Sequence, residues 1–449
     1  MVDLRGASGN TGMMVATGLP PGPALPAMAQ TILSVTNPLS FADRCRAKYG
    51  DVFTMRVFPV GQVVCVSDIG IIRDIVTSDG SVFRAGEANS VIEFVVGRNS
   101  LLMLDGGEHI RRRRVLLPPF RGASVRGHQR SVGQIAADCA RWWPVGRPIR
   151  LLPRMQEITL EIMMRSVFGI TDLARLAGLR TLVPQLLHMN PAIMLFPPLR
   201  RDLGPRSPGG RYARVKRAVD GIIHQEIDRR RRDTAGTTGE DVLSGLMDVR
   251  DEHGAPLSDE ELRDHLVTLL AVGHETTATS MSWIFERLVR HPRVLARLRT
   301  EIAESTTDEP EYVDAVINET LRLRPVVSDI ARVATTDTRV GGYHVPRGTM
   351  IALSISAIHR SPDQFSAPEA FRPERFLDGE TAHEVFLPFG GGPHRCLGAS
   401  FAMMVMRRVV PRIVAELDIR AARPEPESAR LTGPVLTPSR GAEVVVSRR

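Results

Sequence analysis

A segment near the carboxyl end of this 449-residue chain, from Phe389 to Gly398, constrains its fold more than any other. It reads FGGGPHRCLG, so that Cys396 lies in a glycine-loosened loop directly before a run rich in Ala, Met and Val that predicts a helix. Free amides and the dipole at a helix N-terminus favour a thiolate, and glycines allow a flat macrocycle to approach the backbone. The segment therefore suits a thiolate ligand for iron. The alternative is a glycine-rich turn that carries a buried cysteine.

The same segment resembles the haem-binding signature of the cytochrome P450 family. By this resemblance, Cys396 is the axial thiolate ligand of haem b (iron protoporphyrin IX), Phe389 covers the loop, and His394 donates a hydrogen bond to a haem carboxylate. The resemblance also implies a fold that is mainly α with small β-sheet regions. In that fold the haem lies between a long central helix and the helix that follows the cysteine loop.

A long apolar stretch from residue 262 to residue 289 predicts the central helix. Ser258 and Glu261 precede it with the spacing of a capping box, which marks a helix N-terminus. In its middle, residues 273–277 read GHETT and place a carboxylate and two hydroxyls in an otherwise apolar element. Such hydroxyls bond back to the preceding turn and bend a helix, which opens space for a small ligand. A polar patch that faces a neighbouring helix is the alternative interpretation.

The GHETT segment resembles the oxygen-activating motif of the cytochrome P450 family. This resemblance implies that Thr276 hydrogen-bonds the iron-bound oxygen and that Glu275 relays protons inward. Val272 departs from the family pattern, which has Ala or Gly at this position. Its extra methyl groups are expected to narrow the space above the iron.

Glu319 and Arg322 are three residues apart on a helix predicted from residue 312 to residue 323, so both lie on one face of it. An isolated pair of this kind is usually exposed and contributes only a few tenths of a kcal/mol. By the family resemblance, Arg375 joins the pair in a structural network that supports the cysteine loop.

Haem carries two propionates, for which guanidinium and imidazole groups are the natural partners. The histidine-to-arginine spacing of the family falls on His109 and Arg113, at the start of a predicted helix, and a further family contact falls on Arg332. Together with His394, these residues form the expected propionate-binding set. A solvated face or a nucleic-acid patch is the alternative for the arginine-rich run 109–114.

The formal net charge of +8 raises the question of nucleic-acid binding. Aromatic residues make up only 5% of the chain, however, and nucleic-acid binders usually combine aromatic with basic side chains, so no nucleic-acid partner is expected. Basic charge near the cysteine loop is instead expected to dock an acidic electron donor. The arginines expected there are Arg111, Arg112, Arg395, Arg407 and Arg408. Because no dinucleotide-binding signature is present, the resemblance implies a ferredoxin or flavodoxin, with its reductase, as the donor.

Length and composition fit one large domain that contains a cofactor. We expect a flexible N-terminal tail at residues 1–18 and a single catalytic domain at residues 19–449, with two strands between Asp51 and Asp68. The four cysteines have no Cys-x-x-Cys spacing, which indicates a reduced setting, and the first 18 residues resemble neither a secretory signal nor a membrane span. The expectation is a cytoplasmic, bacterial-type enzyme without a membrane anchor.

Four mostly apolar segments are expected, by the family resemblance, to line the substrate pocket. They are residues 91–96, 191–198, 326–327 and 431–436. Their composition suggests a lipid-like, steroidal or terpenoid substrate, and plain core packing is the alternative for any apolar stripe. Asp329 and Glu93 are polar exceptions for which we expect surface positions.

The predicted function is that of a haem-thiolate monooxygenase. Such an enzyme inserts one oxygen atom from O2 into a small apolar substrate, with electrons from a separate redox partner. Alternatives are a peroxide-driven hydroxylase or a non-redox isomerase of the same fold, and a non-catalytic haem-based gas sensor. Glu275 and Thr276 favour the monooxygenase, because the alternatives can dispense with an acid and an alcohol at these positions.

Overall fold

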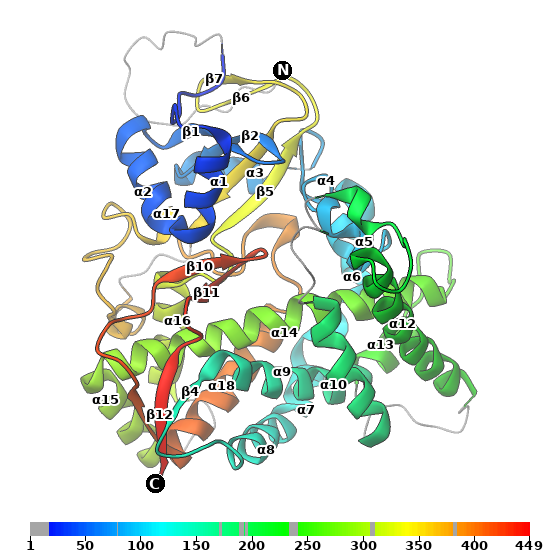
Figure 1. Ribbon diagram of the computed structural model, residues 1–449, viewed down its shortest axis with the longest axis vertical. Coiled ribbons are helices and arrows are strands. Elements are labelled where there is room, and N and C mark those ends of the chain that lie inside the picture. The colour runs from blue at the N-terminus through cyan, green and yellow to red at the C-terminus, as the bar shows by residue number, and fades with distance from the viewer. Residues whose placement is uncertain are drawn as a thin grey trace.

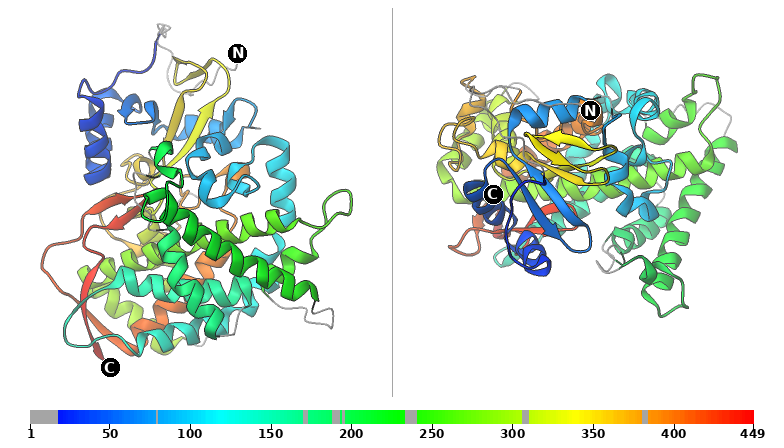
Figure 2. Two further views of the ribbon diagram at one scale, coloured as in Figure 1. Left: turned by 45° about the vertical axis from the view of Figure 1, so that its right-hand side comes forward. Right: turned by 90° about the horizontal axis from the view of Figure 1, so that it is seen from above.

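The computed structural model describes residues 18–78, 80–169, 173–187, 193, 196–232, 241–305, 310–379 and 384–449. A β-sheet with its covering helices forms one end of the molecule, and a mass of packed helices forms the rest (Figures 1 and 2). This arrangement confirms the predicted fold class, mainly α with small β-sheet regions. The predicted tail at residues 1–18 lies, except for its last residue, outside the described residues.

The helices and strands have the following bounds. The α-helices are α1 Ala27–Thr36, α2 Pro38–Tyr49, α3 Ile69–Thr77, α4 Ala85–Ala88, α5 Glu93–Val96, α6 Gly106–Leu116, α7 Gly122–Gly127, α8 Gln129–Ala140, α9 Leu151–Phe168, α10 Leu173–Leu187, α12 Pro208–Arg232, α13 Val242–Asp248, α14 Asp259–Arg290, α15 Pro292–Glu304, α16 Glu311–Leu323, α17 Ile355–His359 and α18 Ala399–Glu416. The 3-10 helices are η1 Ser90–Ile92, η2 Leu101–Met103, η3 Pro118–Phe120, η4 Pro197–Arg200, η5 Pro373–Phe376 and η6 Gly392–His394. The strands are β1 Val52–Val57, β2 Gly61–Val66, β3 Phe83–Arg84, β4 Pro148–Arg150, β5 Asp329–Ala334, β6 Thr338–Val340, β7 Tyr343–Val345, β8 Met350–Ser354, β9 Leu417–Ala421, β10 Ala429–Thr432, β11 Val435–Pro438 and β12 Glu443–Arg448. Within the described ranges, no helix combines the length and apolar character that crossing a membrane requires.

The largest sheet has the strand order β1-β2-β8-β5-β3. Its first two strands form the antiparallel hairpin predicted between Asp51 and Asp68. β8 pairs in parallel with β2 and in antiparallel orientation with β5, so segments far apart in the sequence meet in one sheet. Helix α3 buries Ile71, Ile72 and Ile75 in the hydrophobic cluster of this sheet.

The predicted central helix is α14, which runs without a break through the middle of the molecule (Figure 1). It starts with the predicted capping box, in which Ser258 Oγ accepts from the Glu261 N–H and the Glu261 carboxylate accepts from the Ser258 N–H. Most of its length is buried in the largest hydrophobic cluster, together with α9 and α18. A Cβ at Gly273 would lie only 2.9 Å from Cε of Met163 on α9. The two helices therefore cross closely at the segment that carries the predicted acid and alcohol.

A buried ion network joins α16 to the chain before the cysteine loop. The Nε and Nη2 atoms of Arg322 donate to the Glu319 carboxylate at 2.7 and 2.9 Å, and Nε of Arg375 lies 3.1 Å from that carboxylate. Arg322 also donates through Nη1 to the carbonyl oxygen of His359 at 2.7 Å. None of the three charged side chains is more than 1% exposed. The network predicted for Glu319, Arg322 and Arg375 is therefore present, and it is not the exposed pair that the spacing alone indicates.

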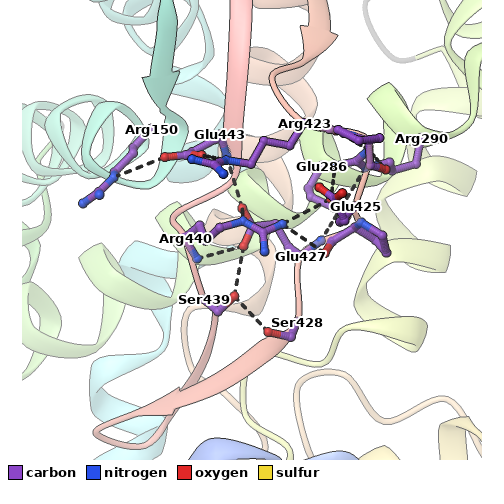
Figure 3. Close-up of polar contacts among 12 residues, drawn as sticks. Arg150, Glu286, Arg290, Arg423, Glu425, Glu427, Ser428, Ser439, Arg440 and Glu443 are labelled. Carbon is purple, nitrogen blue, oxygen red and sulfur yellow. Dashed lines mark hydrogen bonds and ion pairs between the residues drawn. The ribbon is translucent and has the colours of Figure 1, made fainter.

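Charged side chains tie the C-terminal strands to the end of α14 (Figure 3). Arg290 donates to the carbonyl oxygens of residues 423–425, and the buried Glu286 accepts from the N–H of Glu427 at 3.2 Å. Glu427 in turn accepts from the N–H of Arg440 at 2.8 Å. These bonds anchor the segments on both sides of the β10–β11 hairpin.

The same hairpin contacts the chain that follows α16. The N–H of Leu436 donates to the carbonyl oxygen of Val326 at 2.8 Å, and Nε1 of Trp283 donates to the carbonyl oxygen of Leu436 at 2.8 Å. Two of the segments predicted to line the substrate pocket, 326–327 and 431–436, therefore lie side by side.

We expect Glu319→Gln to lower the free energy of unfolding by about 3–5 kcal/mol, because it leaves the buried Arg322 and Arg375 without a compensating charge. Glu369→Gln is the matched control, since Glu369 is 63% exposed and also binds an arginine, Arg360, at 2.8 Å. An exposed pair of this kind contributes less than about 1 kcal/mol. Urea unfolding of the two purified variants measures both changes, and equal unfolding midpoints would contradict the role given to Glu319.

Candidate active site

Cys396 lies three residues before α18, in the loop that the sequence predicts. Its N–H donates to the carbonyl oxygen of Phe389 at 2.9 Å, which closes the loop, and its sulfur accepts from the N–H of Gly398. Gly392 has a φ of 64°, and a Cβ there would lie 1.8 Å from the carbonyl oxygen of Val76. Only glycine fits at this position, so the loop packs directly against the end of α3.

The thiol of Cys396 is accessible to solvent although protein surrounds it closely. Burial raises the pKa of this thiol, while the N–H of Gly398 and the charges of Arg113 and Arg395 act in the opposite direction. A side chain that is both accessible and desolvated lies in a recess. A cation bound in this recess would favour the thiolate, which is the form of cysteine that binds metals.

The four residues predicted to hold propionates come together beside this recess. His109 and Arg113 come from α6, which begins three residues before His109 rather than at it, Arg332 comes from β5, and His394 from η6. The rings of His109 and His394 stack with their centroids 3.8 Å apart. Both arginines lie close enough to act electrostatically on both imidazoles. Among the described residues, the buried Nδ1 of His109 has no hydrogen-bond partner.

This cluster concentrates positive charge with little negative charge to balance it. The pKa of His109 is lowered to about 4 by burial and by the charges of Arg113 and Arg332. The pKa of His394 is lowered to about 3 by burial, by His109 and by both arginines. Burial also lowers the pKa of Arg113 and of Arg332. The carboxylate of Asp105 opposes these shifts for His109 and Arg332, but its Oδ1 remains 3.8 Å from Nε2 of His394.

These residues fit haem. Two carboxylates brought by a ligand would relieve the repulsion between the two guanidinium groups and supply a partner for the buried Nδ1 of His109. A Cβ at Gly398 would meet no atom within 4 Å, and one at Gly390 would meet only Cδ1 of Ile330, at 4.0 Å. The loop is therefore open where a flat macrocycle would approach. Phe389 packs against the largest hydrophobic cluster.

The acid and the alcohol of α14 have different partners. Thr276 Oγ1 donates to the carbonyl oxygen of Val272 at 2.6 Å, which is the back-bond expected of a hydroxyl inside a helix, although α14 remains continuous here. Glu275 accepts from Nε2 of Gln156, on α9, at 3.1 Å. Val272 is 38% exposed in spite of its place on a mostly buried helix. Its side chain is therefore accessible from outside the helix packing.

The predicted substrate segments are only partly described. Of residues 191–198, those at 191, 192, 194 and 195 lie outside the described residues, while Ile193 is buried. Val327 is 36% exposed, and Glu93 is exposed as expected. Asp329 is accessible, but burial raises the pKa of its carboxyl, which accepts from Ser328 Oγ at 2.6 Å. Asp329 therefore lies in a recess rather than on the outer surface.

Three residues of the site are not indicated by the sequence. Asp105 accepts from the backbone of α4 and lies beside the cationic cluster, Gln156 binds Glu275, and His359 supports the cysteine loop. Asp105 precedes two glycines and a predicted helix, which marks it only as a cap. Nothing in the local pattern distinguishes Gln156 or His359 from ordinary polar positions.

Comparisons with known proteins agree with this geometry. The family model described as Cytochrome P450 matches residues 19–446. Cytochrome P450 135B1 of Mycobacterium tuberculosis is 39% identical over 435 residues, which cover 96% of this chain and 91% of that protein. Cytochrome P450 135A1 of the same organism is 36% identical, with 96% and 95% covered. The structure is similar to that of retinoic-acid-bound cyanobacterial CYP120A1, with a TM-score of 0.82, 25% identity, and 97% of this chain and 100% of that chain covered.

His359 supports the approach to the cysteine loop from a fully buried position. Its Nε2 accepts from the N–H of Leu387 at 2.9 Å, and its ring lies against Phe365 and Phe386. An accepting Nε2 requires the neutral imidazole. Burial, together with the charge of Arg322, lowers the pKa of His359 to about 3.

This lowered pKa predicts a loss of stability in mild acid. Below the unfolded pKa of about 6.5, the unfolded chain binds a proton that folded His359 does not, so the stabilisation present above pH 6.5 is lost as the pH falls toward 3. Between pH 6.5 and pH 5 the loss is about 2 kcal/mol. His359→Gln, which keeps an oxygen acceptor for Leu387, should flatten the dependence by that amount in urea unfolding across this range. If the free energy of unfolding depends on pH equally in the original protein and in His359→Gln, the assignment to His359 is wrong.

Proposed function

The chain belongs to the cytochrome P450 family, and we propose that it inserts one oxygen atom from O2 into an apolar, lipid-like substrate with electrons from a ferredoxin or flavodoxin. Family membership makes the chain a haem monooxygenase with a cysteine thiolate ligand. The observation that carries the assignment of the site is the accessible, desolvated thiol of Cys396 beside a buried cationic cluster.

We assign the axial ligand to Cys396 and the catalytic domain to residues 19–449. The other cysteines support this choice, because Cys45 and Cys65 are buried in another cluster and Cys139 lies on α8. Bound haem supplies the oxygen-activating chemistry, and the thiolate donates electron density to it. Phe389 keeps the loop packed against the core and so limits access of water to the sulfur from that side.

His109, Arg113, Arg332 and His394 would bind the two propionates. In the folded chain the two guanidinium groups lie in one cluster with the two imidazoles, and burial desolvates all four, so carboxylates are the partners that their environment favours. Bonds to propionates would orient the macrocycle between the cysteine loop and α14.

Glu275 and Thr276 would manage protons. Each turnover consumes two protons, and an acid next to an alcohol in the middle of α14 provides a carrier and a hydrogen-bonding group. The Thr276 oxygen retains lone pairs for a second hydrogen bond while it donates to Val272. Gln156 holds Glu275 on the α9 side of the helix.

The proposed electron donor is an acidic ferredoxin or flavodoxin, served by its reductase. Of the arginines expected to dock it, Arg112, Arg407 and Arg408 are engaged with neighbouring side chains of the chain itself. Arg395 is exposed and adjacent to Cys396. Arg111 is exposed as well, but its Nε lies 3.7 Å from the carboxylate of Glu252. We therefore place the centre of the docking surface at Arg395. Such a donor implies a cytoplasmic enzyme.

The proposed substrate is a long apolar molecule of the lipid or isoprenoid kind. Val272 and Val327, which are accessible and apolar, border the space expected above the haem. CYP120A1, similar in structure over nearly the whole chain, binds retinoic acid, an apolar polyene with one carboxylate. The extra methyl groups of Val272 favour a slender chain over a broad ring system.

The test of this function is consumption of reduced nicotinamide with a surrogate ferredoxin and reductase, coupled to hydroxylated product. Substrates for the assay come from a screen of fatty acids, isoprenoids and steroids for shifts of the haem spectrum. Formation of hydroxylated product in proportion to the nicotinamide consumed supports the proposal. Turnover with peroxide alone would instead indicate a peroxide-driven hydroxylase. Tight binding of diatomic gases without any turnover would indicate a sensor.

Cys396→Ser should abolish the red-shifted Soret band of the reduced, carbon-monoxide-bound protein, because a serine hydroxyl does not replace thiolate charge donation. Cys139→Ser is the control and should leave the band unchanged. A normal band in Cys396→Ser would exclude Cys396 as the ligand.

Thr276→Ala should reduce product formation about 10²-fold while nicotinamide consumption falls far less, so that most of the O2 is released as hydrogen peroxide. Thr279→Ala is the control on the same helix, since the buried Thr279 hydroxyl has no hydrogen-bond partner in the part of the chain that the structure describes. Haem content should be unchanged in both variants. Equal product per O2 in the two variants would remove Thr276 from proton transfer.

A further inference from the structure

A pocket of about 470 Å³ lies between α14 and the helices α8, α9 and α10. Trp142, which is 82% exposed, lies at its outer side, and Leu160 is part of its apolar wall. Gln156 of α9 and the buried His274 of α14 also line it. The pocket therefore reaches from the surface to the residue next to Glu275.

Gln156 links this pocket to the acid of α14. Its side chain lines the pocket while its Nε2 donates to Oε1 of Glu275 at 3.1 Å. Nearby, Thr159 Oγ1 lies 2.9 Å from Nδ1 of His274 and donates to its carbonyl oxygen at 3.2 Å, which fixes the helix against α9. Thr276, one residue further on, projects about 100° around the helix axis from Glu275. The acid therefore contacts a residue that lines the pocket, and the alcohol projects from another side of α14.

Carboxylates surround the pocket. Asp138 and Glu157 are both more than half exposed and each pairs with an arginine, Arg141 at 3.9 Å and Arg154 at 2.8 Å. Glu161 is buried and bound by Arg165 and Arg180 at 2.6 and 2.7 Å. A pocket of this size with several polar groups holds water.

We propose that this pocket is the aqueous end of the proton path to the reaction site, and that Gln156 is the positioning residue that keeps Glu275 in contact with it. The inference rests on the proposed function, in which Glu275 carries protons. A hydronium ion in the pocket loses a proton to the Glu275 carboxylate, which passes it toward Thr276 and returns to its charged form. Each turnover takes two such protons and two electrons from the donor protein, with one oxygen atom inserted into a C–H bond and the other released as water.

Cys139 provides a way to fill the pocket, because it is part of the lining. In the haem-loaded protein it is modified with a benzyl or a methyl thiosulfonate, which leaves a large or a small group as a mixed disulfide. Cys45 and Cys65 are buried, and Cys139→Ser treated in the same way is the matched control. Burial raises the pKa of Cys139 to about 11, so modification is carried out at alkaline pH and followed to completion by mass spectrometry.

The benzyl adduct should lower product per O2 at least about fivefold and enlarge the solvent deuterium isotope effect, because proton supply becomes limiting. The methyl adduct and the treated Cys139→Ser control should match the untreated protein, and haem content and the carbon-monoxide spectrum should be the same in all samples. Equal coupling and equal isotope effects in the benzyl and methyl adducts would overturn the proposal.

Gln156→Met, which keeps the length but removes the donor, and Gln156→Lys, which restores a donor, test the positioning role. In the resting protein, the infrared carboxyl band of Glu275, identified by difference from Glu275→Gln, should shift in Gln156→Met and return toward its original position in Gln156→Lys. Product per O2 should likewise fall in Gln156→Met and return toward its original value in Gln156→Lys. An unchanged band in Gln156→Met, or equal uncoupling in both variants, would eliminate this role.

Glu275→Gln distinguishes a failure of the proposed role of Glu275 from a failure of the proposed role of the pocket. If this variant uncouples turnover and the filled pocket does not, the pocket is not the proton source while the proposed role of Glu275 stands. If Glu275→Gln stays fully coupled, both the proposed role and the inference built on it are wrong.

Discussion

A chain of hydrogen bonds that starts at one buried ion pair holds Cys396, the candidate axial ligand, in place. Arg322 binds the Glu319 carboxylate and donates to the carbonyl oxygen of His359, whose imidazole accepts from Leu387. Backbone bonds from residue 390 to residue 387 and from Cys396 to residue 389 then close the loop. The ion pair is costly to desolvate, yet each of its remaining donors has a partner, which makes it rigid. The position of the thiol therefore depends on charges 70 or so residues earlier in the chain.

In the cationic cluster beside the thiol, by contrast, positive charge is not fully compensated by partners. Four donors from three separate elements are desolvated together, and Asp105 is the carboxylate that partly compensates them. A fold that tolerates such repulsion is prepared for a ligand that brings negative charge. Binding of haem would then stabilise the folded chain as well as equip it for chemistry, since a ligand that binds only the folded state shifts the unfolding equilibrium.

Helix α14 separates two environments. One side carries Thr276 and the accessible Val272, while on another side Glu275 binds Gln156 of α9 and His274 lines the pocket. The close crossing with α9 at Gly273 brings Gln156 within reach of the acid. In the proposed function, this division would keep bulk water away from an apolar substrate while protons reach the reaction site through Glu275.

The sequence by itself determined the local features: the cysteine loop with its glycines, the capped central helix, the first hairpin, and the helical spacing of Glu319 and Arg322. Each of these is a short-range pattern in which neighbouring residues specify the backbone. Only the tertiary structure decided the burial of the Glu319 network, the recess around Asp329, and the partnerships of Asp105, Gln156 and His359. Gln156 and Glu275 are 119 positions apart, and their contact arises from the packing angle of two helices, which no periodicity in either segment encodes.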